Sequence, residues 1–423
     1  MSDDKDTPPA RRRRVLFMAE AVTLAHVARP HALANALPTE DYEILFACDP
    51  RYNALFADAQ YRRQPIHSVS SDRFLKSLSK GSPLYDFRTL QRYVEEDLAV
   101  IDAFRPDVIV GDFRLSLSVS ARLRETPYIG ISNAYWSPQA AVRFAAPDLP
   151  MSRLLGPRIA DLVFRTVRPL AFAVHARPIN RLRRASGLAP LRNDIRHAYT
   201  DADLVLFADV PELVALRRQT PWSQFIGPIG WSPRIDLPSW WAQLDRSLPT
   251  VYVTLGSSGN ARLLPQLLAA LSRRPLNIAV STAGSKLDFD CPANVFLADY
   301  LPGDTFASLA SIVVCNGGSP TSHQGLLAGC PIVGIPGNLD QVLNMAGIES
   351  AGVGVAVRPS LRAGEEAGLA VDQMLVNANV KARVTEVQES MQRHSSKFDL
   401  RQNIEQVIRG CGTDLQDSSR SAG

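Results

Sequence analysis

Short apolar runs alternate with amphipathic stretches along most of the chain. In the first half, strands are expected at residues 14–21, 42–49, 107–112, 127–132 and 202–209. Between them, apolar residues recur at helical spacing, as in residues 26–37 and 116–123. Short strands that are apolar throughout and alternate with helices are typical of a parallel sheet covered on both faces. The first half is therefore predicted to be an α/β unit.

The alternation stops over residues 225–249, a segment rich in proline and tryptophan that is predicted to be an ordered linker. It then restarts, with strands expected at residues 250–256, 277–282, 294–300, 311–316, 331–336 and 354–359. The pattern predicts two doubly wound Rossmann-like domains, residues 11–226 and 227–410, that face each other across a cleft. The domain assignment allows the last helix to cross back to the first domain. The polar segment 414–423 is expected to be disordered.

Composition narrows the class of protein. The chain has 423 residues, which favours two domains, and its 46% hydrophobic content supports well-buried cores. A net charge of +4 is too small to indicate a nucleic-acid binder. The five cysteines have no CxxC spacing, and neither a signal peptide nor a membrane span is apparent. We expect a cytoplasmic protein.

The stretch CNGGSPTSHQG contains a glycine turn between a strand and a helix. The strand is expected to end at Asn316, after which Gly317 and Gly318 allow close approach of the backbone to a ligand. Ser319 is expected to cap the helix, with Pro320 in its first turn. The free amides and the dipole of such a helix N-terminus bind anions, phosphate above all. The alternative is that the turn has no ligand role, because any strand-glycine-helix turn of a doubly wound domain can have a similar sequence.

Residues further along the chain favour a sugar nucleotide. Gln324 lies in the first turns of the same helix, where it could reach a ribose. Asp340 and Gln341 follow the next expected strand, and an adjacent carboxylate and amide can bind the hydroxyls of a sugar. The alternative is that Asp340 and Gln341 only cap the helix that follows them.

In this order, these residues resemble the donor-binding signature of the family 1 glycosyltransferases, which are UDP-sugar-dependent, inverting enzymes of the two-Rossmann-domain GT-B type. VYVTLGSSG (residues 251–259) resembles the strand and turn that open the donor domain of that family, and FIGP (residues 225–228) resembles its linker entry. The resemblance implies a nucleoside-diphosphate sugar as co-substrate and no further cofactor. The donor-binding residues that it implies are Ser257, Asn316, Gly317, Gly318, Ser319, Thr321, Gln324, Asp340 and Gln341.

Three residues depart from the family pattern. Asn316 replaces a diphosphate-binding histidine and Gln324 replaces a ribose-binding glutamate. Pro320 stands where glycine is usual and removes one amide donor. With these changes the site can still bind a donor, but the sequence does not identify its nucleotide or its sugar.

His26 is the candidate catalytic base. It follows the first expected strand, and an imidazole titrates near neutrality, as a general base requires. Asp112 ends a later strand at the same edge of the sheet, where a carboxylate could orient the ring. The resemblance implies this pairing, although Ala25 and Pro30 alter the helix start usual in the family. The alternatives are a packing role for His26, with Glu20 as a rival base, and a structural role for Asp112.

Two Asp-x-Asp stretches, residues 201–203 and 288–290, match the metal motif of the other main glycosyltransferase fold. The first opens a strand and the second lies in a polar loop. Neither occurs within the single domain of that other fold, so we predict no metal site.

Residues 153–184 carry eight arginines and one acid, with apolar residues at helical spacing. Such a basic amphipathic stretch could contact an anionic membrane, which would place the protein peripherally at the inner membrane face, or receive a lipidic acceptor. The alternative is an ordinary pair of surface helices.

The function predicted from these features is inverting transfer of a sugar to a hydroxyl of a small hydrophobic or lipid-like acceptor. A sugar-nucleotide epimerase of the same architecture and a non-catalytic auxiliary protein are the alternatives. An epimerase would change the donor sugar without any acceptor, so a donor-only incubation separates the three.

Overall fold

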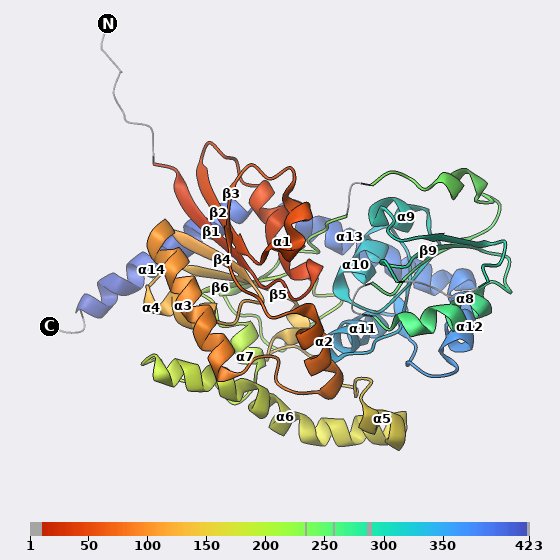
Figure 1. Ribbon diagram of the computed structural model, residues 1–423, viewed down its shortest axis with the longest axis horizontal. Coiled ribbons are helices and arrows are strands. Elements are labelled where there is room, and N and C mark those ends of the chain that lie inside the picture. The colour runs from red at the N-terminus through yellow and green to blue at the C-terminus, as the bar shows by residue number, and fades with distance from the viewer. Residues whose placement is uncertain (1–10, 233–234, 257–258, 286–289, 421–423) are drawn as a thin grey trace, which may run out of the picture.

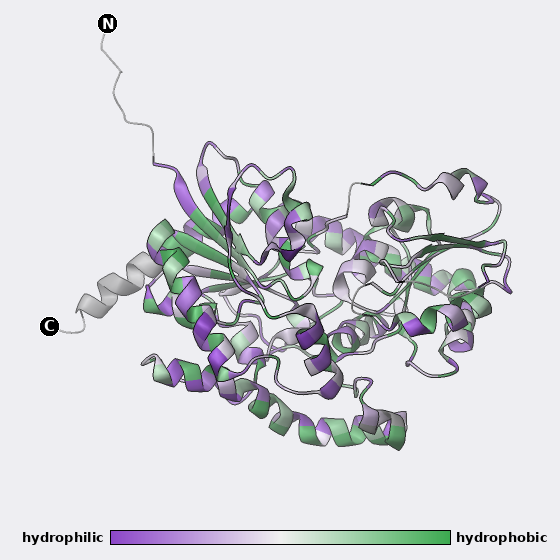
Figure 2. Cartoon of the chain, viewed as in Figure 1, coloured by the Kyte–Doolittle hydropathy of each residue, from purple (hydrophilic) through white to green (hydrophobic). Residues whose placement is uncertain are grey.

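The computed structural model describes residues 11–232, 235–256, 259–285 and 290–420. Two parallel β-sheets lie side by side, each covered by helices (Figure 1). The strands are the most continuously hydrophobic segments of the interior (Figure 2). The predicted α/β architecture of two doubly wound sheets is confirmed.

The first sheet has the strand order β3-β2-β1-β4-β5-β6-β7. Its strands are β1 (Arg13–Ala19), β2 (Tyr42–Cys48), β3 (Arg62–Pro65), β4 (Val108–Asp112), β5 (Tyr128–Ser132), β6 (Leu204–Phe207) and β7 (Ser223–Phe225). All of its ladders are parallel, and β1 pairs with both β2 and β4. The chain therefore reverses its direction of winding at β1 and β4. Ligands usually bind at the carboxyl ends of the strands beside such a switch point.

Helices and short turns surround the first sheet. The α-helices are α1 (Leu24–Asn35), α2 (Ser71–Lys80), α3 (Phe87–Phe104), α4 (Leu117–Leu123), α5 (Pro150–Leu155), α6 (Pro157–Ala185) and α7 (Arg196–Tyr199), with 3-10 helices η1 (Pro50–Phe56) and η2 (Ala134–Trp136). The inner strands are fully buried, β4 and β5 over every residue. Burial on both faces explains why these strands read as uninterrupted apolar runs.

The second sheet has the order β10-β9-β8-β11-β12-β13, again all parallel. Its strands are β8 (Thr250–Thr254), β9 (Asn277–Ser281), β10 (Val295–Ala298), β11 (Ile312–Cys315), β12 (Ile332–Gly334) and β13 (Gly354–Ala356). Its helices are η3 (Ser239–Gln243), η4 (Ala261–Leu263), α8 (Leu264–Leu271), α9 (Gly303–Leu309), α10 (Ser319–Leu327), α11 (Leu339–Ala351), α12 (Ala363–Val376), α13 (Ala378–Lys397) and α14 (Leu400–Arg420). The predicted division between residues 226 and 227 falls directly after β7.

The last helix packs on the first sheet. Leu400, Ile404 and Val407 of α14 belong to the same buried cluster as Val15 and Val110 of that sheet. In addition, Asn403 donates a hydrogen bond of 2.7 Å to Gln224 of β7. The C-terminal segment thus returns to the first half of the chain (Figure 1).

Two expectations from the sequence differ from the structure. The segment from Asp414 was expected to be disordered, whereas α14 continues to Arg420. The sequence also gave no signal for β3 and β7, which are short edge strands with polar residues.

Candidate functional site

A cavity of about 1020 Å³ is lined by residues of both halves of the chain. The first half contributes residues at the carboxyl ends of β1 and β4 and from α2, α6 and α7. The second half contributes residues after β8 and β9, the first turns of α10 and the start of α11. The cavity therefore lies where the topology of both sheets places a ligand.

His26 and Asp112 meet at the wall formed by the first half. His26 lies in the first turn of α1, directly after the loop that follows β1, and Asp112 is the last residue of β4. The Nδ1 atom of His26 is 2.8 Å from Oδ1 of Asp112. Asp112 is completely buried, while the His26 side chain is 20% exposed and lines the cavity. The structure thus brings together the two residues that the sequence pairs as catalytic.

The ring of His26 is fixed from a second side by Phe113. The two rings stack with centroids 4.4 Å apart and an angle of 8° between their planes. Phe113 has a positive φ of 58°, a conformation that is strained for an aromatic residue. Strain of this kind persists only where the surrounding structure enforces it. The strained residue directly follows Asp112, so the backbone there presents both the carboxylate and the stacking ring to His26.

Arg29 is a third member of this cluster that the sequence did not indicate. Its guanidinium donates to both oxygens of Asp112, from Nε and Nη2, at 2.8 Å each. A third donor, Nη1, lies 2.7 Å from Oδ1 of Asn133. The side chain is buried, although an arginine within an apolar helical pattern would normally be read as a surface residue. Asp112 is therefore a paired carboxylate rather than an isolated one.

The tautomer of His26 follows from these contacts. Nη2 of Arg29 is 3.2 Å from Nδ1 of His26, and both nitrogens point to the same oxygen of Asp112. If Nδ1 carries the proton, both donors share Oδ1 of Asp112, and Nε2 keeps a free lone pair. A histidine in this state accepts a proton at Nε2, as a general base does.

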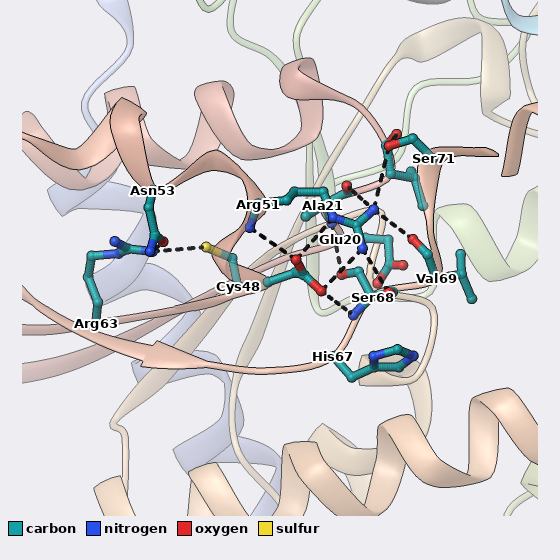
Figure 3. A network of polar contacts seen from close by, with 12 residues as sticks. Glu20, Ala21, Cys48, Arg51, Asn53, Arg63, His67, Ser68, Val69 and Ser71 are labelled. Carbon is teal, nitrogen blue, oxygen red and sulfur yellow. Dashed lines mark hydrogen bonds and ion pairs between the residues drawn. The ribbon is translucent and has the colours of Figure 1, made fainter. Parts of the chain in front are cut away.

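Arg51 holds the loop that leads into α1 (Figure 3). Its guanidinium donates to the main-chain oxygens of Ala21, Val69 and Ser68 at 3.1, 2.8 and 2.9 Å. Asp49 pairs with the same guanidinium at 3.0 Å. A planar guanidinium with five donors suits this role, because it can bind several oxygens of two loops at once. The loop after β1, and with it the position of His26, is fixed by these bonds.

Glu20, the rival base, does not reach the cavity. Its carboxylate is fully buried and accepts hydrogen bonds from Tyr93 at 2.8 Å and from Arg114 at 3.2 Å. Burial raises the pKa of Glu20 to about 7, although Arg114 opposes this shift. A perturbed pKa is common at active sites and also in buried structural networks. Both hydrogen-bond partners are buried and Glu20 does not line the cavity, so the geometry favours the structural role.

His31, also on α1, is buried, although its place on a helix with polar positions would favour the surface. Its side chain is 5% exposed and is hydrogen-bonded to Tyr61 and Asn35. It also packs edge-on against Phe56 of η1. The helix α1 is covered on this side by η1, which the apolar pattern did not reveal.

The glycine turn lies at the opposite wall. β11 ends at Cys315, Gly318 is the N-cap, and α10 begins at Ser319, one residue earlier than the sequence suggested. Asn316, Gly318, Ser319 and Thr321 line the cavity. By helix geometry the amides of Ser319 and Thr321 have no acceptor within α10, and Pro320 has no amide hydrogen. The turn thus presents two backbone donors and two hydroxyls.

The two glycines have different physical roles. Gly317 has a φ of 76°, and a Cβ atom there would lie 2.6 Å from Met345, so this position requires glycine for packing and backbone conformation. Gly317 does not line the cavity. Gly318 has an ordinary φ of −73°, and its amide donates to Oδ1 of Asn316 at 3.0 Å. Asn316 therefore shapes the turn as well as facing the cavity.

Gln324 faces the cavity together with an acid that the sequence did not single out. Its Nε2 donates to Oδ1 of Asp304, at the start of α9, and its side chain lies against Gly303. Both Gln324 and Asp304 line the cavity. An amide and a carboxylate that are already paired offer two oxygens and one further amide hydrogen to the hydroxyls of a ligand.

Asp340 and Gln341 have separate surroundings. Oδ1 of Asp340 accepts hydrogen bonds from Trp136 at 2.7 Å and from Tyr135 at 3.1 Å, both in η2 of the first half. Gln341 forms the capping box of α11 with Asn338, and its Oε1 accepts from the amide of Gly337 at 2.8 Å. Asp340 thus links the two walls, while the side-chain oxygen of Gln341 is used at the helix start.

Ser257 and the two Asp-x-Asp stretches need separate mention. Ser257 lies outside the described residues, as does Asp288 of the second Asp-x-Asp stretch. In the first such stretch, Asp201 pairs with Arg183 at 2.7 Å and Asp203 pairs with Arg122. Within the described ranges there is no cluster of three or more histidine, cysteine or acidic side chains placed to hold a metal ion.

A second buried pair joins the two walls. Nε2 of His323, on α10, lies 3.3 Å from Oδ1 of Asp209, just after β6. The other oxygen of Asp209 accepts from Asn133 at 3.1 Å and from the amide of Ala134 at 2.6 Å. Burial raises the pKa of Asp209 to about 7. Burial, with a smaller contribution from Arg29, lowers the pKa of His323 to about 3.

At neutral pH this pair is therefore best described as a histidine without charge beside a carboxyl group close to its titration point. The two facing atoms are 3.3 Å apart, but neither has a hydrogen-bond partner. Asp209 follows the strand expected at residues 202–209, so the strand-end rule could have flagged it. His323 had no such signal, because a buried histidine and a surface histidine look alike in a short helix.

Solved structures share this fold, and known proteins have similar sequences. The solved structure of a spinosyn rhamnosyltransferase matches with a TM-score of 0.66 at 18% identity, and the match covers 93% of this chain and 100% of that one. The fold is thus that of GT-B glycosyltransferases. No family model matches the chain.

Closer sequence relatives give the family. A "PGL/p-HBAD biosynthesis glycosyltransferase" of Mycobacterium tuberculosis is 45% identical over 402 residues, which cover 95% of this chain and 94% of the relative. A "PGL/p-HBAD biosynthesis rhamnosyltransferase" of Mycobacterium bovis is 46% identical over 400 residues, which cover 95% of this chain and 88% of the relative. The chain therefore belongs to the family 1 glycosyltransferases with two Rossmann-like sheets and is itself a glycosyltransferase.

Proposed function

We propose that this glycosyltransferase moves a sugar from a nucleoside-diphosphate sugar to a hydroxyl of a small hydrophobic or lipid-like acceptor, with inversion at the anomeric carbon. The observation that carries the proposal is the placement of His26 and the N-terminus of α10 in one cavity. A base that faces an anion-binding turn across a cavity suits a direct displacement.

In the proposed step, Nε2 of His26 takes the proton of the acceptor hydroxyl as its oxygen forms a bond to the anomeric carbon. The bond from that carbon to the diphosphate oxygen breaks, and the nucleoside diphosphate leaves with the electron pair. Asp112 stabilises the imidazolium that results, since it lies 2.8 Å from Nδ1. A single displacement of this kind inverts the configuration.

The leaving diphosphate gains negative charge, which α10 is placed to stabilise. The amides and hydroxyls of Ser319 and Thr321 and the positive end of the helix dipole supply that stabilisation without a cation. We propose accordingly that no metal ion or further cofactor takes part. In this proposal Gln324, paired with Asp304, binds the ribose, and Asp340 binds the transferred sugar; all three line the cavity.

The acceptor class follows from the lining of the first-half wall. Around His26 the cavity is lined by large apolar and aromatic side chains, namely Phe74, Leu78, Phe113, Trp136, Phe164, Phe172 and Tyr199. Aromatic walls of this kind favour a ring-bearing or acyl acceptor over a hydrophilic one.

The relatives guide the choice of donor. One of them is named a rhamnosyltransferase, and the spinosyn rhamnosyltransferase has structures with thymidine diphosphate and with its aglycone. A nucleoside-diphosphate rhamnose is therefore the first donor to test in a panel that includes UDP sugars, with alkylated phenols as acceptors.

The test is formation of a glycoside, with the anomeric configuration of the product read by NMR. A product of configuration opposite to that of the donor supports the proposal, whereas retention rules out the single displacement. A donor-only incubation is the control for the other readings. Conversion of the donor into an epimer would replace transfer by epimerisation, and neither product from any donor in the panel would favour an auxiliary protein.

A further inference from the structure

Helices α5 and α6 carry an exposed apolar stripe at the outer edge of the molecule. Leu154, Ile159, Leu162 and Leu170 are 86, 56, 60 and 65% exposed. Ile159, Leu162 and Leu170 lie on one face of α6, because they are separated by close to whole numbers of helical turns. Figures 1 and 2 show these two helices along the lower edge of the view, with hydrophobic residues on them.

The stripe is larger than scattered surface leucines would explain. A compact group of exposed large hydrophobic side chains falls within residues 154–170 of the described chain. A contiguous exposed apolar surface of this kind marks an interaction site in a soluble protein. Nothing else in the described chain covers it.

Positive charge continues the same face of α6. Arg177 and Arg184 follow Leu170 at intervals of two helical turns, and Arg165 flanks the stripe. All three arginines are exposed. The one acid of the stretch, Asp161, is paired with Arg358 at 2.7 Å. The surface therefore joins leucines to unneutralised arginines.

Not all eight arginines of residues 153–184 belong to this surface. Arg183 is buried, where it donates to Asp201 at 2.7 Å and to the main-chain oxygen of Ala189 at 2.8 Å. Arg181 stacks on Phe87, with its guanidinium carbon 4.5 Å from the ring centre. These two residues hold α6 to the rest of the protein.

The adjacent face of α6 lines the cavity. Phe164, Ala171 and Phe172 line the cavity, and Val167 does so while 45% exposed. Val167 therefore lies at the border between the exposed stripe and the cavity wall. An apolar chain could run from the outer face of α6 into the cavity without crossing a polar barrier at this helix.

We propose that the outer face of α5 and α6 docks on an anionic lipid surface. Leucines that enter the interface and arginines that meet lipid phosphates are the two requirements for a helix that lies in the plane of a membrane. Charge complementarity selects anionic over zwitterionic lipid. The border at Val167 then places the opening of the cavity at the lipid surface, where an apolar acceptor would be held.

The experiment is co-sedimentation of the full-length protein with vesicles of phosphatidylglycerol and phosphatidylcholine. Binding is expected at low salt, with release at high salt as the charges are screened, and little binding to pure phosphatidylcholine. The basic variant carries Arg165→Gln, Arg177→Gln and Arg184→Gln. Because each arginine contributes roughly fivefold to the partition, we expect a loss of about a hundredfold.

A matched control removes three positive charges elsewhere. Arg262→Gln, Lys381→Gln and Lys397→Gln change exposed residues of η4 and α13 and should leave vesicle binding within about twofold, since the net charge alone is not the cause. An apolar variant, Leu162→Ser with Leu170→Ser, should weaken binding by about tenfold or more. Far-UV circular dichroism of each variant reports whether it is folded.

Three outcomes would overturn the proposal. One is no sedimentation with anionic vesicles at low salt. Another is equal loss of binding in the basic variant and its control. The third is self-association of the lipid-free protein that the leucine variant abolishes, which would assign this face to a second copy of the chain. None of these readouts depends on transfer activity, so they leave the proposed reaction to its own test.

Discussion

The first-half wall of the cavity and the turn before α10 in the opposite wall handle charge in opposite ways. The wall of the first half buries charged side chains, with Asp112 held between Arg29 and His26. The turn before α10 has neutral groups instead, because Asn316, Ser319 and Thr321 offer amides and hydroxyls. A base needs a fixed carboxylate that favours its protonated form, whereas a diphosphate needs donors that point at it.

The difference also explains how each wall is supported. Buried charges are costly unless they are paired, and three donors surround Asp112. A neutral turn needs correct backbone geometry more than charge pairing, and Gly317 with Asn316 provides it. The charged wall should therefore be sensitive to loss of a partner, and the neutral turn to loss of space or of a hydrogen bond.

The largest expected effect comes from the base. His26→Ala should lower kcat by about 10²–10⁴-fold, because the variant lacks the Nε2 atom that is proposed to take the acceptor proton. Affinity for the nucleotide sugar should change little, since the proposed donor site lies at the opposite wall. Steady-state kinetics together with a donor titration measure both. His394→Ala, on α13, is the matched control, and retention of more than half of the activity by His26→Ala would remove His26 from the reaction.

Removal of Arg29 should damage folding as well as catalysis. In Arg29→Met the carboxylate of Asp112 is left buried with His26 as its remaining close hydrogen-bond donor, which should cost about 3–5 kcal/mol in the free energy of unfolding. Urea denaturation measures this loss. Arg29→Met combined with Asp112→Leu should regain part of it, because no charge is then buried. A double variant less stable than the single one would show that Asp112 does not depend on Arg29.

For the pair of Asp209 and His323 we predict that replacing either residue makes the stability of the protein depend on pH. In the folded protein the pair holds one proton, on or near Asp209, up to about pH 7. In the unfolded chain, at a pH between the ordinary pKa values of the two groups, His323 holds one proton. The folded and unfolded states then bind the same number of protons, so this pair does not make stability depend on pH from about pH 4 to 6.5.

His323→Gln leaves Asp209 alone, with a pKa above its unfolded value. The folded state then binds more protons than the unfolded state, so stability should fall as pH rises from about 4 to 7, by up to about 1.4 kcal/mol per unit. Asp209→Asn leaves His323, with a pKa below its unfolded value, so stability should rise from about pH 3 to 6.5. Chemical denaturation over this range measures both slopes, and parallel curves for the two variants would contradict the opposite pKa shifts of Asp209 and His323.

The smallest effect is expected where a single hydrogen bond joins the walls. Trp136→Phe removes the 2.7 Å bond to Asp340 and keeps an aromatic ring in the cavity. Loss of one hydrogen bond to a carboxylate should weaken donor affinity by about three- to tenfold, because Asp340 is then less well oriented. Tyr135→Phe removes the longer bond of 3.1 Å and should have less effect. Tighter donor binding in Trp136→Phe would mean that Trp136 competes with the sugar.

The inner strands and the pairing of His26 with Asp112 could be predicted because local rules determine them. β1, β4, β6 and β11 are short apolar runs, and polar residues at their carboxyl ends face a ligand in a parallel sheet. The strands β3 and β7 were missed because their sequences, RRQP and SQF, carry no apolar run. Edge strands take their place from a neighbour's hydrogen bonds rather than from burial.

The contacts between the walls could not be predicted from local patterns. Trp136 and Asp340 are 204 residues apart, and nothing near either residue marks the other. The same holds for Asp209 and His323. Arg29 lies close to His26 in sequence, yet its burial depends on Asp112 and Asn133 from two other strand ends. Such residues are identified only once the sheets are placed against each other.

The central claim is that Nε2 of His26 takes the proton of the acceptor hydroxyl. The most direct measurement compares kcat of the wild-type protein and of His26→Ala over a series of substituted phenols of increasing acidity. A more acidic hydroxyl needs less help from a base, so the ratio of the two kcat values should fall steadily along the series. A ratio that stays constant while both enzymes remain folded and bind donor equally would contradict general-base catalysis by His26.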